Sequence, residues 1–276
     1  MAEVTAAAVK SLRDRTNLPM MECKKALVEA DGDEDKAIEM ITAKMRIKVG
    51  KRADNEAKEG RVFAETSENG NELAVVELRC ESEPVAGSPQ FTELGHLLVK
   101  TLLSGPGATT PDELLAQNDE SGTPLSQRMD DVVTKIQEKF DLTRVARHTA
   151  PFGVYVHHNG KTAAVMCAEG AAGDAETLKG IAAHIAAMKP EALTTDDVDP
   201  AKAQVERDRL TDEAKSSGKP DNIVEKIVDG QMNRWYKEDA GVLVEQAYVY
   251  DDSKTVGQVL AEKGLSPKHF DLFVIG

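Results

Sequence analysis

The sequence predicts an α+β fold made of a small three-helix domain, a duplicated α+β core with antiparallel sheets, and an antiparallel helical hairpin inserted in the core. The first 44 residues have helical patterning interrupted by turn residues. The middle of the chain twice shows short strands followed by an amphipathic helix, and a highly charged helical stretch follows. We therefore expect domains at 1–54 and 55–141, and a third at 142–276 with the hairpin at 197–239.

The N-terminal domain is predicted from three helical segments, at 5–15, 20–30 and 33–43. Thr5 and Asp33 suit helix N-caps, and Pro19 suits the first turn of the second helix because it lacks an N–H and has a fixed φ. Three short helices of this length are similar to a ubiquitin-associated domain. The basic run at 44–52 that follows is expected to be a solvated linker, with a local anion-binding patch as the alternative.

The core is predicted from two strand-and-helix units. A turn at 68–71, with Asn69-Gly70 at its centre, predicts a hairpin in the first unit. The strands and helices of that unit are expected at 61–65, 72–80, 91–103, 112–117 and 126–140. The second unit is expected to repeat the plan, with strands and a helix at 142–149, 152–158, 161–168 and 174–188.

The charged stretch predicts two helices, at 200–217 and 220–237, that fold back on each other. Gly218 suits the end of the first helix and Pro220 the start of the second. The apolar residues available for the seam between them are few: Val205, Leu210, Ile223, Ile227 and Val228. The remaining elements are expected at 243–250 (strand), 256–263 (helix) and 270–275 (strand).

Composition excludes several classes of protein. The chain carries 48 acidic and 34 Lys and Arg residues, a net charge of −14, so general nucleic-acid binding is not expected. Its three cysteines are far apart and indicate neither a disulfide framework nor a zinc site. No apolar run reaches the roughly 20 residues that span a bilayer, and the N-terminus has no signal or transit pattern. We expect a cytoplasmic protein that does not bind membranes.

The sequence shows no catalytic constellation, and we expect no catalytic residues, no metal and no cofactor. Gly160-Lys161-Thr162 looks like the end of a phosphate-binding loop, but that motif needs a glycine where Tyr155 stands. We expect a hairpin turn there instead. The alternative is an enzyme with a site between the core halves, which requires the side chains of His148, His157 and Cys167 to meet in one pocket.

Two adjacent methionines stand at the turn between the first two helices. Met20 and Met21 are flanked by Arg13, Lys24 and Lys25. Soft apolar side chains beside basic ones suit a surface that binds a partner protein. The alternative is that one or both methionines fill the core of the three-helix domain.

These residues carry a resemblance to the elongation factor Ts family, the nucleotide-exchange factors of elongation factor Tu. The matching residues near the N-terminus are Leu12-Arg13, Thr16, Met20-Met21, Cys23-Lys24-Lys25-Ala26-Leu27, Ala30-Asp31-Gly32-Asp33 and Ala37-Ile38. Further matches extend over nearly the whole chain, at Tyr155-Val156-His157, His184, Lys189-Pro190, Ser217-Gly218-Lys219-Pro220 and 253–258. The second signature of the family, Thr-Asp-Phe-Val-Ala, falls at Ser82-Glu83-Pro84-Val85-Ala86.

The resemblance implies a guanine-nucleotide exchange factor that is not an enzyme. It implies binding to elongation factor Tu in its GDP-bound and nucleotide-free forms, with a dimer of heterodimers as one form of the assembly. It assigns contacts with the partner to Arg13, Met20, Met21, Ser82, Glu83, Pro84, Val85, His157 and His184. The phenylalanine of the family signature, which disturbs the nucleotide site of elongation factor Tu, is Pro84 here. The alternative is therefore a relative that docks on elongation factor Tu without exchange activity.

Overall fold

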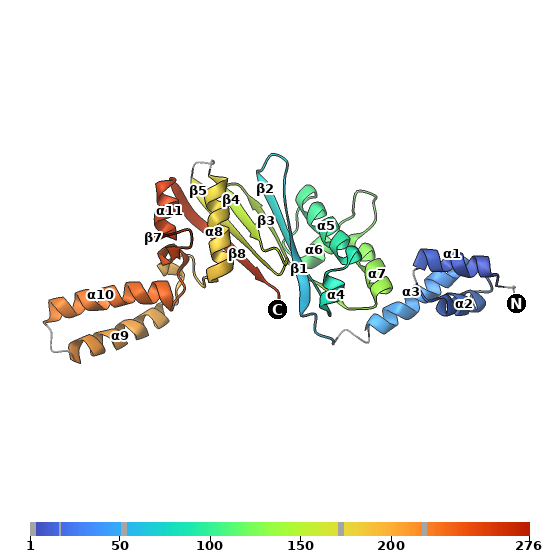
Figure 1. Cartoon of the computed structure of the whole chain (residues 1–276), viewed down its shortest axis with the longest axis horizontal. Coiled ribbons are helices and arrows are strands. Elements are labelled where there is room, and N and C mark those ends of the chain that lie inside the picture. Colours follow the sequence, from blue (N-terminus) through green and yellow to red (C-terminus); the bar gives the residue numbers. More distant parts are fainter. Residues whose placement is uncertain (1–3, 17, 51–53, 171–173, 217–219) are drawn as a thin grey trace. The chain divides into compact units, whose positions relative to one another are not determined.

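The structure is a computed structural model that describes residues 4–16, 18–50, 54–170, 174–216 and 220–276, and of 45–50 the backbone only. It confirms the predicted α+β fold, with helices and antiparallel sheets (Figure 1). Contacts divide the chain into a first unit of 1–65, 74–147 and 275–276, and a second of 66–73 and 148–274. The three predicted domain ranges are not tested by this division and stay a prediction.

Three helices form the N-terminal part, as predicted: α1 (Ala6–Thr16), α2 (Met20–Glu29) and α3 (Glu34–Gly50). Thr5 and Asp33 act as the expected N-caps, since Thr5 Oγ1 accepts from the Ala8 N–H at 3.2 Å and Asp33 Oδ1 accepts from two amides at 3.0 Å. The basic run at 44–52 begins inside α3, so the expectation that it forms a linker is wrong up to residue 50. Its side chains from residue 45 on, like Asn17, lie outside the described residues.

The first sheet has the strand order β1-β2-β3, from β1 (Glu59–Thr66), β2 (Glu72–Cys80) and β3 (Phe140–Thr149). The predicted turn joins β1 to β2, with the Ser67 N–H bound to the Glu72 carbonyl at 2.9 Å and Gly70 at φ +71°. The strand predicted at 142–149, which is β3, is expected in the second unit of the core. It belongs beside β2 instead, where Thr143 Oγ1 donates to the Glu77 carboxylate at 2.8 Å.

Helices α4 (Glu83–Ala86), α5 (Pro89–Ser104), α6 (Pro111–Leu115) and α7 (Leu125–Ile136) accompany this sheet. Helix α7 ends four residues earlier than predicted because Gln137 takes the left-handed conformation at φ +62°. Strand β3 then starts at Phe140. The ring of Phe140 packs edge-on against the ring of Phe91, with 5.2 Å between the ring centroids. The main buried side chains of this core are Phe63, Val76, Leu78, Phe91, Leu94, Leu98, Leu102, Leu114, Leu125 and Phe140.

The second sheet is antiparallel with the order β4-β5-β8, from β4 (Phe152–Val156), β5 (Thr162–Gly170) and β8 (Leu265–Val274). Helix α8 (Ala175–Met188) covers one of its faces (Figure 1). The helix comes so close to β4 that a Cβ on Gly153 would lie 2.1 Å from the backbone carbonyl carbon of Leu178. The hairpin turn expected at Asn159-Gly160 is present between β4 and β5, with Gly160 at φ +68°.

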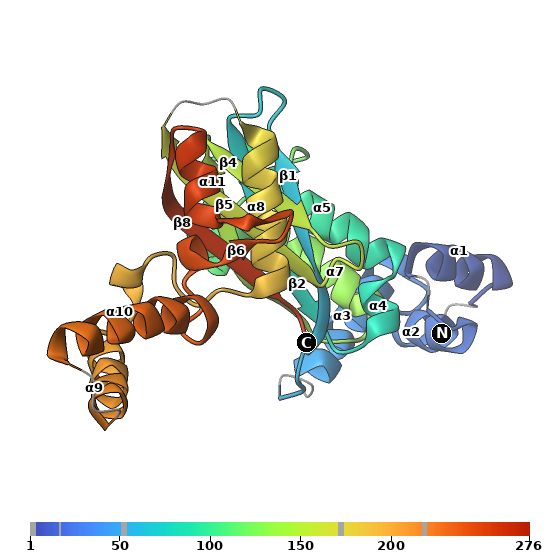
Figure 2. The same cartoon turned by 60° about the vertical axis from the view of Figure 1, so that its left-hand side comes forward.

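A 3₁₀ turn, η1 (Thr195–Asp197), leads into the predicted hairpin, in which α9 (Pro200–Ser216) and α10 (Asp221–Glu238) lie side by side (Figure 2). Its seam differs from the expected one, since Val205 and Ile223 are exposed. The buried residues are Leu210, Ala214, Val224, Val228 and Met232. Residues 217–219, which include the predicted Gly218 cap, lie outside the described residues.

The strand expected at 243–250 is mostly absent. Its place is taken by a 3₁₀ turn, η2 (Leu243–Glu245), and a two-residue strand, β6 (Ala247–Tyr248), which pairs with β7 (Asp251–Thr255). The N–H groups of Leu243 and Val244 bond instead to the carbonyls of Ala192 and Leu193, at 2.8 and 3.2 Å, so they are not available to a strand partner. Helix α11 (Val256–Glu262) then leads into β8, as predicted.

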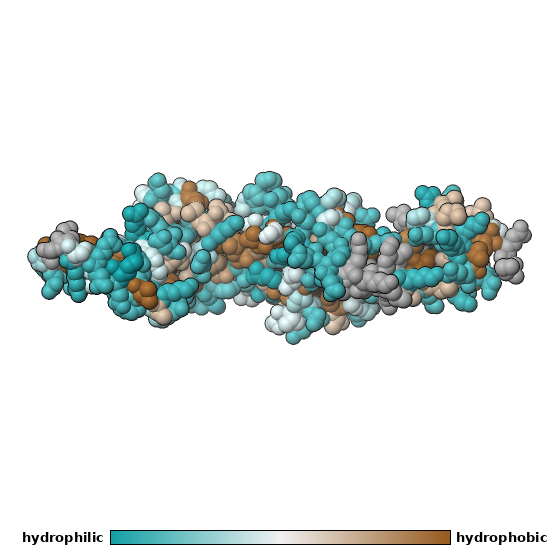
Figure 3. All heavy atoms as spheres, turned by 90° about the horizontal axis from the view of Figure 1, so that it is seen from below, coloured by the Kyte–Doolittle hydropathy of each residue, from teal (hydrophilic) through white to brown (hydrophobic). Residues whose placement is uncertain are grey.

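The surface agrees with the charged composition. On the face seen in Figure 3, hydrophilic side chains predominate and hydrophobic ones gather in smaller areas. Among the described residues, no helix combines the length and the apolar character needed to cross a membrane.

The close approach of α8 to β4 predicts that Gly153→Ala destabilises the fold. The added methyl group has no space, so α8 or β4 must shift, at a cost of about 2 kcal/mol or more. Gly230→Ala is the matched control, because Gly230 lies in α10 with nothing within 4 Å of a Cβ, and we expect a gain of about 0.5–1 kcal/mol there. Urea denaturation of both variants measures the two effects. Equal stabilities would contradict the close packing at Gly153.

Candidate partner-binding site

The turn into α2 presents an apolar and basic surface. Met20 and Met21 are 51% and 64% exposed, so the alternative that they fill the domain core is wrong. Val28 lies two turns further along α2, on the side of Met21, and is also exposed. The side chain of Arg13 is exposed as well. Three exposed apolar side chains on a small helical domain suit contact with another protein.

The segment at the second family signature is held by two acidic side chains. Glu138 accepts from the Ser82 N–H at 3.1 Å and from the Ser82 hydroxyl at 2.6 Å. In return, Glu81 accepts from the Lys139 N–H at 2.7 Å. We call these three hydrogen bonds to two carboxylates, which join residues 81–82 to 138–139, the carboxylate clamp. It fixes the start of α4 against the connection between α7 and β3.

Helix α4 divides the signature residues by exposure. Glu83 and Pro84 are exposed, Val85 is half-buried, and Ala86 is buried in the core of the first unit. The Glu83 carboxylate pairs with Arg61 of β1 at 2.5 Å. The exposed edge of α4 therefore consists of a charge held by an ion pair and a rigid ring, both available to a partner.

The buried thiol of Cys80 also binds this segment. Its Sγ lies 3.3 Å from the carbonyl oxygen of Ser82, to which it donates. Burial raises the pKa of Cys80 to about 12. This cysteine therefore acts as a packed hydrogen-bond donor.

The two histidines assigned to the partner lie in different surroundings. His157 is half-buried in the turn after β4, where Nδ1 lies 2.8 Å from the Tyr155 hydroxyl. His184 is fully buried, with Nε2 2.9 Å from Gln246 Oε1, and its Nδ1 accepts from the Val249 N–H at 3.3 Å. In this conformation His184 offers no surface to a partner, so its predicted direct contact does not fit the structure. It positions the turn at Val249 instead.

The alternative of an enzyme required three side chains to meet. His148 and Cys167 do lie together, with Nδ1 and Sγ 3.5 Å apart. His157 does not join them: it follows Val156, which pairs with Ala163 at the far end of β5 from Cys167. The proposed three-residue site is therefore not formed.

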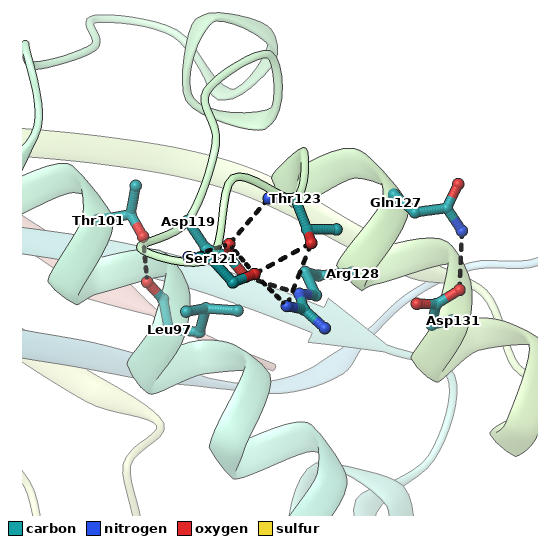
Figure 4. Close-up of polar contacts among 8 residues, drawn as sticks. All are labelled: Leu97, Thr101, Asp119, Ser121, Thr123, Gln127, Arg128 and Asp131. Atoms are coloured by element: carbon teal, nitrogen blue, oxygen red, sulfur yellow. Dashed lines mark hydrogen bonds and ion pairs between the residues drawn. The ribbon is translucent and has the colours of Figure 1, made fainter. Parts of the chain in front are cut away.

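A hollow of about 590 Å³ lies in the first unit between the end of α5 and the loop after α6. Figure 4 shows its rim, where Asp119 accepts from Ser121 and binds Arg128 Nε at 2.7 Å. Lys100 on α5 is paired with Glu120 at 2.8 Å. Since these charges are already paired with one another, we assign no ligand to the hollow.

Metal binding has no support in the described parts of the chain, where no group of three His, Cys, Asp or Glu side chains gathers closely enough to hold an ion. The important residues that sequence reasoning missed are Glu138, Arg61 and Gln246. Each contacts a residue that the resemblance assigns to the partner, from at least 22 positions away in the sequence. No local pattern could have identified them.

Comparison with known proteins gives one consistent result. The sequence model of the family described as Elongation factor TS matches residues 81–276. The chain is 38% identical over 285 residues to elongation factor Ts of Hyphomonas neptunium, covering all of this chain and 93% of that protein. It is 38% identical over 283 residues to elongation factor Ts of Lacticaseibacillus casei and of Lacticaseibacillus paracasei, with the same coverage.

The burial of His184 predicts a pH dependence of stability. Burial lowers its pKa, against the effect of Gln246, so the folded state holds neutral His184 while the unfolded state takes up a proton near pH 6.5. This stability is present above that pH and is lost as the pH falls. Between about pH 7.5 and about pH 5.5, we expect the unfolding free energy of the native protein to fall by up to about 1 kcal/mol more than that of His184→Gln. Urea denaturation at both pH values measures the difference, and parallel changes would contradict it.

Proposed function

This chain belongs to the elongation factor Ts family of translation elongation factors, and on that premise we propose that it is the guanine-nucleotide exchange factor of elongation factor Tu. It binds elongation factor Tu, promotes the release of GDP and lets GTP rebind during translation elongation. The observation that carries this proposal is the similarity to the family along the entire chain. The exposed methionines and the exposed edge of α4 add to it.

The mechanism is a linkage between two binding equilibria. The protein binds nucleotide-free elongation factor Tu more tightly than the GDP-bound form, and by reciprocity it weakens GDP binding by the same factor. No bond is made or broken, so catalytic residues, a cofactor or a metal are not needed. The protein works as a binding partner in the cytoplasm, without direct contact to nucleic acid or membrane, and can form a dimer of heterodimers.

The contacts with the nucleotide-binding domain of the partner come from two places. Met20 and Met21 bury their exposed side chains against it, with Arg13 beside them. At α4, Glu83 and Pro84 disturb the phosphate site. Ser82 and Val85 take part mainly by holding α4 in place, because Ser82 is bound to Glu138 and Val85 is half-buried.

The second unit contributes contacts through the half-buried ring of His157 in the turn after β4. His184 contributes by positioning the turn at Val249 and Tyr250, whose side chains are 44% and 69% exposed. We propose that this turn, and not His184 itself, faces the partner.

The second candidate is a relative that docks on elongation factor Tu without promoting exchange. It is favoured by one observation, the replacement of the aromatic ring of the family signature by Pro84. Glu83 stands where the family signature has aspartate. It keeps the carboxylate, on a longer side chain, and forms an ion pair with Arg61.

The experiment that decides between them is the release of fluorescent GDP from elongation factor Tu of the same organism. We expect strong acceleration by the native protein. Met20→Ala with Met21→Ala should weaken the acceleration about tenfold or more at limiting protein, because two buried methionines are lost from the interface. Val205→Ala, at an apolar position on α9 that is more exposed than either methionine, is the control and should change nothing. A stable complex without acceleration would instead support the docking relative, and no complex would overturn both.

We further expect Pro84→Phe to raise the exchange rate. A phenyl ring buries more apolar surface than a pyrrolidine ring, a difference of roughly 1–2 kcal/mol, which corresponds to about ten- to thirtyfold. Pro220→Phe, at the exposed start of α10, controls for the addition of an aromatic ring elsewhere. Nucleotide release under single-turnover conditions measures the rates. An unchanged or lower rate for Pro84→Phe would contradict the assignment of Pro84 to the phosphate site.

A further inference from the structure

A cysteine, a histidine and an aspartate meet in the second unit at a place that the proposed function does not use. Cys167 on β5 pairs with His269 of β8, and Val165 pairs with Asp271. Residues that oppose each other in an antiparallel pair share one face of the sheet, as do residues two apart. Cys167, His269 and Asp271 therefore share the face opposite to the one that packs against α8.

The imidazole of His148 lies between the sulfur and the carboxylate. Its Nδ1 is 3.5 Å from Cys167 Sγ, and its Nε2 is 3.0 Å from Asp271 Oδ2. The same carboxylate oxygen lies 3.2 Å from His269 Nε2. The carboxylate and the thiol thus lie at opposite nitrogens of the ring, which is the arrangement of an acidic residue, a base and a nucleophile in sites that activate a cysteine.

The charges in this cluster stabilise the imidazolium that forms when His148 takes the proton of the Cys167 thiol. Burial by itself lowers the pKa of His148, but Asp271 and the Cys167 sulfur outweigh burial and raise it to about 9. An imidazolium beside a sulfur stabilises the thiolate relative to the thiol, and the thiolate is the reactive form of cysteine.

The other two cysteines have different surroundings. Cys23 and Cys80 are 0% exposed, whereas Cys167 is 6% exposed. The Cys23 sulfur faces the carbonyl of Leu18 at 3.7 Å, and the Cys80 sulfur faces that of Ser82 at 3.3 Å. In these two places the sulfur faces a carbonyl oxygen, whereas the Cys167 sulfur faces an imidazole, so Cys23 and Cys80 are built-in controls for Cys167.

We propose that Cys167 is a modification site at which hydrogen peroxide forms a sulfenic acid, with His148 as proton carrier and Asp271 as the residue that positions it. The small access to the sulfur favours this small, uncharged oxidant over larger electrophiles.

The oxidation of the thiol needs no reagent other than hydrogen peroxide. The Cys167 thiol gives its proton to His148 Nδ1, and the thiolate attacks one oxygen of the peroxide. The S–O bond forms as the O–O bond breaks, so sulfur is oxidised and the peroxide is reduced. The leaving hydroxide takes the proton back from His148 Nδ1. The products are the sulfenic acid and one water molecule.

The test exposes the folded, full-length protein to hydrogen peroxide at neutral pH, removes the peroxide with catalase, and then traps sulfenic acid with dimedone in denaturant, where the reagent reaches every cysteine. Mass spectrometry then follows the labelling rate of each cysteine separately. We expect Cys167 to be labelled about tenfold or more faster than Cys23 and Cys80. When the peroxide itself is added in denaturant, the three rates should become similar, since the surroundings of Cys167 are then lost.

Variants test whether His148, and not only the access of peroxide to the sulfur, determines the labelling rate of Cys167. His148→Gln should slow the labelling of Cys167 by about tenfold or more, and Asp271→Asn should slow it to a smaller extent. His158→Gln, an exposed histidine in the same unit, is the matched control and should leave the rate within about twofold.

Two results would overturn the proposal. One is a labelling rate of Cys167 equal to that of Cys80 in the folded native protein. This comparison needs no variant, so it does not depend on whether the variants fold. The other is a His148→Gln variant that folds, by circular dichroism, and still labels Cys167 at the native rate.

Discussion

The carboxylate clamp determines where the exposed edge of α4 lies. Ser82 gives both its N–H and its hydroxyl to Glu138, and Lys139 gives its N–H to Glu81. Hydrogen bonds to ionised carboxylates are stronger than those between neutral groups. Because the helix they anchor has only four residues, it is too short to hold itself by its own backbone bonds. The orientation of Glu83 and Pro84 therefore comes from residues outside α4.

In the second unit, the main constraint is close packing of a helix on the sheet and not a set of hydrogen bonds to carboxylates. Helix α8 lies directly on β4 because Gly153 has no side chain, and small residues on β5, such as Ala164 and Ala168, let the helix settle on the sheet. On the same helix, His184 reaches Gln246 and the backbone of Val249. One helix thus both closes the core and fixes the turn that we propose as a contact surface.

The sequence was sufficient for features that depend on neighbours in the chain. Thr5 and Asp33 were recognisable as caps and Asn69-Gly70 as a turn, because each acts on backbone within a few residues. Pairings between distant residues were not recognisable. The place of β3 beside β2 and the bonds from Glu138 join positions more than 50 residues apart. For the candidate site, the resemblance to the family supplied the residues, and only the structure separated the exposed ones from those that position them.

The thin seam of the hairpin has a consequence for local unfolding. Among the described residues, only five side chains are buried between α9 and α10. The ion pairs across and along these helices, such as Arg207–Asp229, are about half exposed and hence weak in salt. A segment with so little buried surface opens at a small fraction of the global unfolding free energy. The hairpin can therefore exchange its amide hydrogens and lose its helices while both sheets stay intact. The chain thus carries a rigid binding edge in its first unit and, in its second unit, an arm whose order costs little to give up.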